Sequence, residues 1–138
     1  PIRWDYNRRY DRYSPYYALD TAVDDISNVF NRRDMRALDR LVPRNDWVQI
    51  KGEWERDYEI RSDDYYDMMR DLVNSTNTRS FRIDRVEEAR GYARVLATHT
   101  YSDAGRYDSR VSMEFILEQD RRGSYVITEF GTYLNDRW

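Results

Sequence analysis

One histidine and one late glutamate are the residues best suited to acid–base chemistry. The chain has 138 residues, with His99 as its only histidine and no cysteine. His99 lies on the apolar side of the strand-like run YARVLATHTY, and Glu129 lies on the apolar side of the later run SYVITEF. A histidine held beside a carboxylate can act as a general base with an orienting partner. We therefore ask whether the two side chains can meet.

The spacing of the strand-like runs argues against such a pair. Turns centred near Ala104 and Arg121 would pair His99 with Ser109, and Met113 with Glu129. At about 3.3 Å per residue and about 4.8 Å per strand, His99 and Glu129 would then lie roughly 16 Å apart. We predict no dyad. If the chain is an enzyme, His99 would be the acid–base group with Tyr101 beside it; otherwise His99 is a half-buried strand histidine with satisfied hydrogen bonds.

Other kinds of site find little support in the sequence. Zinc sites favour several histidine or cysteine ligands, and no glycine-rich phosphate loop is present, so we expect no metal and no cofactor. The net charge of −3 disfavours a general nucleic-acid binder. No run approaches the roughly 18 apolar residues of a membrane span. The lack of cysteine does not fix the compartment, although we favour a secreted or extracytoplasmic location.

Three helices are predicted from apolar spacing and end signals. Ser14-Pro15 begins the first, whose apolar residues recur with a period near 3.6: Leu19, Ala22, Val23, Ile26 and Phe30. Asp34 can cap a second, short helix that ends before Pro43. Ser62 can cap a third, in which Tyr65, Met69 and Val73 share one face.

The remaining segments alternate with a period of two, which predicts strands. Val48 and Ile50 mark one strand, and a turn at Lys51-Gly52 would lead into a second, EWERDYEI, with its four acids on a solvated face. After Ser80 a long meander follows, with glycines at the expected turns. This order predicts an α+β fold in which one antiparallel sheet has its inner face covered by the helices.

The element order and the closing pattern resemble the nuclear transport factor 2-like superfamily across about residues 14–133. That pattern is the strand ATHTYSD, a turn, VSMEFILEQDRRG and SYVITEF. The resemblance implies a cone, in which a curved sheet wraps the long first helix and leaves a pocket at its open end. Met113, Phe115 and Glu129 would line this pocket, where a small apolar ligand could bind. Members include steroid isomerases, scytalone dehydratase and SnoaL-type cyclases, as well as non-catalytic binding modules, and no catalytic residue of the isomerases matches a position here.

The segment before the first helix is rich in tyrosine and arginine. We divide the chain into an extended arm (residues 1–13), a nuclear transport factor 2-like domain (14–134) and a short tail (135–138). Large apolar side chains alternate along the start of the arm, so it needs a surface: its own sheet or that of a neighbouring subunit. The residues expected to support self-association are aromatic or large and apolar: Ile2, Trp4, Tyr6, Tyr10, Tyr13 and Trp138.

Two main functions are consistent with these features. The first is a non-catalytic cone-fold domain that forms homo-oligomers, either dimers or filaments, with the arm as an assembly element. The second is a small-molecule isomerase, dehydratase or cyclase that uses the cone pocket. Recognition of a peptide or glycan outside the cell is a third option. The sequence does not decide whether the chain is an enzyme, and we favour the non-catalytic interpretation.

Overall fold

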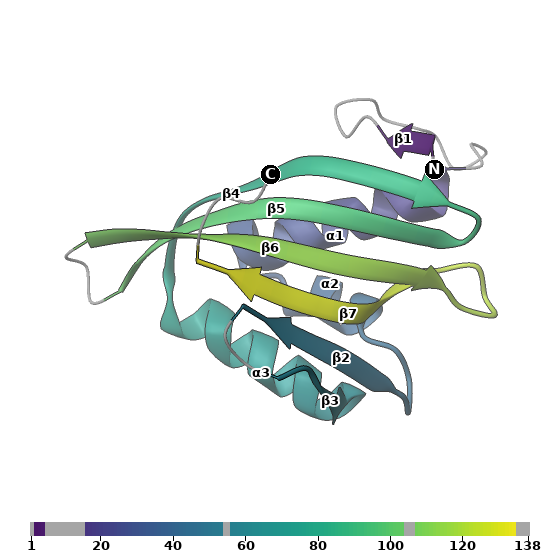
Figure 1. Ribbon diagram of the computed structural model, residues 1–138, viewed down its shortest axis with the longest axis horizontal. Helices are drawn as coiled ribbons and strands as arrows, with labels where there is room; N and C mark the ends of the chain where they lie inside the picture. Colours follow the sequence, from purple (N-terminus) through teal and green to yellow (C-terminus); the bar gives the residue numbers. More distant parts are fainter. Residues whose placement is uncertain (1, 5–15, 54–55, 104–106, 135–138) are drawn as a thin grey trace.

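One seven-stranded sheet forms the body of the described protein (Figure 1). The structure is a computed structural model that describes residues 2–4, 16–53, 56–103 and 107–134. Its strands, in chain order, are β1 (Ile2–Trp4), β2 (Trp47–Gly52), β3 (Tyr58–Arg61), β4 (Asn77–Ala89), β5 (Tyr92–Asp103), β6 (Tyr107–Gln119) and β7 (Tyr125–Tyr133). In space they follow the order β1-β4-β5-β6-β7-β2-β3. Neighbouring strands are antiparallel except for β2 and β7, which run parallel.

Three helices lie against one face of this sheet, as Figure 1 shows: α1 (Tyr17–Arg32), α2 (Met35–Leu41) and α3 (Ser62–Ser75). The predicted apolar stripe of α1 is buried and packs against the inner sides of the long strands. Arg33 ends α1 in the left-handed region, at φ 52°. The Asp34 carboxylate then accepts hydrogen bonds from the backbone amides of Arg36 and Ala37, so Asp34 caps α2 as predicted.

The expected α+β class is confirmed, as is the curved, mostly antiparallel sheet around a long helix with two shorter helices. Two local expectations are wrong. β2 runs on through Gly52 and β3 begins only at Tyr58, so the link is longer than a two-residue turn and Arg56 lies outside the strand. Ser62 is the first residue of α3 rather than its cap, and its hydroxyl accepts the Asp46 amide hydrogen instead.

The strand registers also differ from the expected ones. The β5–β6 turn is centred one residue later than predicted, so His99 pairs with Val111. A bulge between β6 and β7 moves the pairing from Leu117–Ile127 to Ile116–Glu129. A bulge adds one residue to one strand, which reverses the side on which the following side chains lie. Phe130, and not Glu129, therefore joins the core.

Candidate functional site

His99 lies inside the molecule and is fully buried. Its Nε2 is 2.8 Å from the Thr78 hydroxyl, while its Nδ1 has no hydrogen-bond partner among the described residues. Burial lowers the pKa of His99 from 6.5 to about 4. An unpaired acceptor is easier to bury than an unpaired N–H donor, which favours the tautomer with its proton on Nε2, donated to Thr78. His99 is therefore a neutral ring at pH 7.

Aromatic rings fill the space around His99. Tyr101 stacks against the imidazole with ring centroids 5.0 Å apart, and Phe30 of α1 lies at the same distance. Phe30 in turn stacks on Phe81 at 4.4 Å and meets Phe115 edge-on at 6.4 Å. The two sequence-predicted site residues His99 and Tyr101 are thus in contact, within a closely packed cluster.

The three residues expected to line a pocket separate into two groups. Met113 and Phe115 are each 1 % exposed and belong to the core cluster. Glu129 lies on the opposite side of the sheet because of the β6–β7 bulge, and its carboxylate is 3.5 Å from the Lys51 ammonium. The structure therefore keeps His99 and Glu129 on different faces of the sheet. The sequence argued against a dyad from the distance between the two residues, whereas in the structure the β6–β7 bulge separates them.

The first residues of the arm form a short strand on the protein's own sheet. Ile2, Arg3 and Trp4 pair with Glu88, Glu87 and Val86 of β4. The other predicted self-association residues, namely Tyr6, Tyr10, Tyr13 and Trp138, lie outside the described residues. The arm therefore supplies an edge strand over the part that the structure describes.

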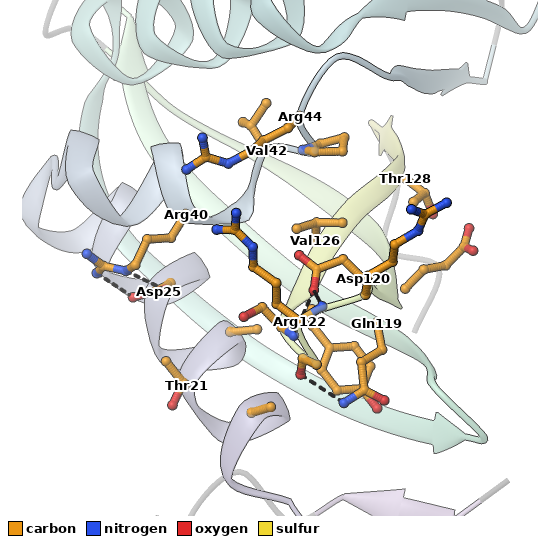
Figure 2. A pocket seen from close by; sticks show the side chains of 18 of the residues that line it. Thr21, Asp25, Arg40, Val42, Arg44, Gln119, Asp120, Arg122, Val126 and Thr128 are labelled. Carbon is orange, nitrogen blue, oxygen red and sulfur yellow. Dashed lines mark hydrogen bonds and ion pairs between the residues drawn. The ribbon is translucent and has the colours of Figure 1, made fainter.

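An open groove of about 950 Å³ lies outside the aromatic cluster, and it was not predicted from the sequence (Figure 2). Its walls are the first half of α1, the end of α2 with the segment that follows, and the turn between β6 and β7. We call this cavity the hairpin groove. Apolar contact surface comes from Val42, Pro43, Tyr125 and Val126. Four arginines line it: Arg40, Arg44, Arg121 and Arg122.

Two of the groove's carboxylates are held by strong internal contacts. The Arg40 guanidinium binds Asp25 through two nitrogens, at 3.1 and 2.8 Å, and the Asp25 side chain is only 9 % exposed. This hydrogen-bonded pair raises the pKa of Arg40. Asp120 accepts hydrogen bonds from the backbone amides of Arg122 and Ser124, at 2.8 and 3.0 Å, and so fixes the β6–β7 turn.

The other three arginines of the groove are free. Within the described ranges, the side chains of Arg44, Arg121 and Arg122 have no hydrogen-bond or ion-pair partner. Figure 2 shows the Arg44 and Arg122 side chains projecting from different walls of the groove. Free guanidinium groups carry five N–H donors that match carboxylate and phosphate oxygens. The arrangement can bind an anionic group.

The sheet face opposite the helices carries charged and polar side chains in paired rows. Arg94 of β5 donates to Glu114 of β6 at 2.5 Å and to Glu87 of β4 at 3.2 Å. The hydrogen bond that Arg94 donates to the Glu114 carboxylate raises the pKa of Arg94. At the other end of the sheet, the Arg61 guanidinium lies over the half-exposed Trp47 ring, 5.5 Å from its centroid. No helix covers this face in Figure 1.

The described residues contain no cluster of three or more histidine, cysteine or acidic side chains placed to hold a metal ion. None of the helices they form is both long and apolar enough to cross a membrane.

Comparison with solved structures shows a nuclear transport factor 2-like fold, as the sequence pattern predicted. A DUF4783 family protein from Bacteroides ovatus matches with a TM-score of 0.66 and 12% identity, over 82% of this chain and 94% of the other. A ketosteroid isomerase-like protein from Erwinia carotovora matches at 0.65 and 14%, over 90% and 98%. An NTF2 protein described as having a long sheet matches at 0.61 and 17%, over 80% and 95%. At such identities the likeness establishes the fold alone.

No protein-family model matches the chain, and no curated protein matches it either.

Proposed function

We propose that this protein is a non-catalytic cone-fold domain that works by self-association, through its N-terminal strand and its uncovered sheet face. The observation that carries the proposal is the pairing of Ile2–Trp4 with Val86–Glu88. This pairing uses backbone hydrogen bonds at a sheet edge, which the same strand of a second copy can also make. Exchange of an identical element between subunits is a common route to dimers, and repeated exchange in one direction produces filaments.

The edge on which the arm lies has room for a partner. β4 spans thirteen residues, and β1 pairs with only three of them. Over residues 77–85 no other described strand pairs with this edge. Charged side chains at Arg79, Arg82 and Asp84 oppose indiscriminate strand pairing, which favours a specific partner over aggregation.

The uncovered sheet face supports the same proposal. Trp47 is 49 % exposed and is stacked with Arg61. Tryptophan and arginine are enriched at protein interfaces and often carry much of the binding energy. The ion-paired rows on β4–β6 supply charges of both signs, so a second copy can meet this face with complementary charges.

Catalysis in the cone is less well supported. The candidate acid–base residue His99 is enclosed by Phe30, Phe81 and Tyr101, and its Nε2 is already hydrogen-bonded to the Thr78 hydroxyl. A substrate would have to displace packed aromatic rings to reach it, at a cost of several kcal/mol. The ketosteroid isomerase-like neighbour shares the fold at 14% identity, and a likeness at that level carries no activity over to this chain.

The arm's role is tested by deleting residues 1–13 and measuring the mass in solution by light scattering. The intact chain is expected to exceed the 16.9 kDa of one copy, and the deletion to return it toward that mass. An unchanged assembly after the deletion would reject the arm's role.

The sheet face is tested separately with Trp47→Ser. The matched control is Tyr107→Ser, because Tyr107 is 81 % exposed and lies at the start of β6, beside the β5–β6 turn. Trp47→Ser is expected to weaken association by roughly tenfold or more, as for a central interface aromatic, and Tyr107→Ser to leave it within about twofold. Equal effects of the two substitutions would contradict the use of this face.

A further inference from the structure

We infer that the hairpin groove is a binding site for a small organic anion, a carboxylate or phosphate ester joined to an apolar, preferably aromatic, body. This inference does not depend on self-association. The groove's volume of about 950 Å³ lies within the range of pockets that enclose small organic ligands, roughly 300–1,000 Å³.

The charges that remain available in the groove favour an anion. Its lining contains four arginines and five acidic residues, Asp25, Asp39, Asp46, Glu118 and Asp120. Asp25 is bound by Arg40, and Asp120 is used by the backbone amides of its own turn. Asp46 accepts the Trp47 amide hydrogen at 2.8 Å, and Asp39 acts electrostatically on Arg40. Three of the five acids, Asp25, Asp46 and Asp120, thus have internal hydrogen-bond partners, whereas Arg44, Arg121 and Arg122 have no side-chain partner among the described residues.

The positions of those arginines suit one ligand group. Arg44 follows α2, while Arg121 and Arg122 lie in the β6–β7 turn on the opposite wall. Figure 2 shows Arg44 and Arg122 on facing sides of the same space, with Val126 and Thr128 beside them. A carboxylate or phosphate has enough acceptor oxygens to bind guanidinium groups from both walls, which a single surface arginine cannot provide.

The turn that holds Arg122 is braced from several sides. Besides the two bonds to the Asp120 carboxylate, the Asp120 amide donates to the Ser124 carbonyl at 2.8 Å, and the Gln119 side chain donates to the Gly123 carbonyl at 2.8 Å. Gly123 has a φ of 86°, a backbone conformation that residues other than glycine rarely adopt. A turn fixed in this way holds the backbone of Arg121 and Arg122 in place before a ligand arrives, so only the side chains must be ordered on binding.

The apolar wall explains why we infer an organic anion rather than a simple ion. Val42 and Pro43 lie on the α2 side, and Tyr125 and Val126 lie on the strand side. Tyr125 and Val126 are only 8 % and 9 % exposed, so an apolar body contacts only their outer edges, and this modest burial still adds binding free energy that inorganic phosphate cannot gain. The inferred ligand therefore carries both an anionic group for the arginines and an apolar body for the apolar wall.

The test is a titration of the intact chain with phenyl phosphate, in which binding is measured by calorimetry and by changes in amide chemical shifts. Inorganic phosphate and benzylamine serve as comparison probes. We expect phenyl phosphate to bind most tightly, with shifts at residues 120–126 and 42–46. Equal binding of inorganic phosphate would overturn the inference, because the apolar wall would then contribute nothing; equal binding of benzylamine, or no binding of phenyl phosphate, would overturn it as well.

Variants connect that binding to the groove. Arg122→Gln and Arg44→Gln are each expected to weaken phenyl phosphate binding roughly tenfold or more, the effect of losing a charged hydrogen bond. Arg36→Gln is the matched control, because Arg36 is an exposed α2 residue outside the groove. The replaced side chains are exposed and without partners, so folding is preserved. Equal affinity of the Arg122, Arg44 and Arg36 variants, or binding of an acidic peptide without binding of phenyl phosphate, would contradict the assignment.

Discussion

His99 and Arg122 illustrate two opposite environments in this small domain. His99 is fully buried, stacked between aromatic rings and neutral at pH 7, and among the described residues its ring has one hydrogen-bond partner, Thr78. Arg122 is exposed, charged and free of side-chain partners, on a turn that is itself firmly held. His99 is held among packed aromatic rings, whereas the Arg122 guanidinium faces solvent on the outside of the cone. The difference teaches that in this fold a titratable side chain can be sequestered by packing while unpaired cationic groups lie outside the core.

The largest expected effect comes from opening the interior. Phe30→Ala removes a ring that contacts Phe81, His99 and Phe115. Replacing a buried phenylalanine by alanine costs about 3–5 kcal/mol of unfolding free energy. Urea denaturation should show a loss of that size, while Arg122→Gln should change stability by less than about 0.5 kcal/mol. Similar losses for both variants would erase the contrast between interior and groove.

The next largest expected effect is a pH dependence of folding stability that is caused by His99. Its pKa is about 4 in the folded protein and 6.5 without burial, so the unfolded chain takes up the proton first. The stability associated with the neutral ring is complete above about pH 6.5 and is lost as the pH falls toward 4. At 1.36 kcal/mol per unit, the loss amounts to roughly 3 kcal/mol. The residues packed against the ring, namely Thr78, Phe30, Phe81 and Tyr101, carry no charge near neutral pH.

That prediction is checked with nuclear magnetic resonance, because the only histidine gives ring signals without overlap. The ring should titrate near pH 4, and denaturation of the His99→Gln variant should lack the loss of stability between pH 6.5 and 4. A titration midpoint near 6.5 would mean that the ring is open to water and that the interior is not closed.

A smaller effect is expected at the floor of the groove. Arg40→Ala leaves the Asp25 carboxylate, which is nearly buried, without its two charged hydrogen bonds. We expect a loss of about 2 kcal/mol in unfolding free energy, since an unpaired buried charge is costly. The reciprocal change, Asp25→Asn, should cost less, because Arg40 is 55 % exposed and can be hydrated. If Asp25→Asn costs more, the pair is not anchored as described.

The smallest effect is expected on the uncovered sheet face. Arg94→Ala breaks contacts to Glu87 and Glu114, but the Arg94 side chain is 41 % exposed and surface ion pairs contribute roughly 0–1 kcal/mol. Thermal denaturation should show a change of that order. A loss above about 2 kcal/mol would place these charges among the main stabilising contacts instead of on a surface that remains available to partners.

The amount that the sequence could predict differs between elements. The apolar stripe of α1 and the Asp34 cap depend on nearby residues, so both were predicted correctly. The side of Glu129 depends on a bulge opposite β6, and a period-two pattern contains no signal for one extra residue. The hairpin groove joins residues 17–25, 39–46 and 118–128, which meet only through the fold. No local motif could have indicated it.

The most direct test of self-association is the mass of the intact chain in solution, measured by light scattering over a wide range of protein concentration. A closed interior with an available strand edge and sheet face predicts a mass that rises above 16.9 kDa toward a whole multiple of it. A mass that stays at 16.9 kDa at every concentration would contradict self-association as the function of this domain.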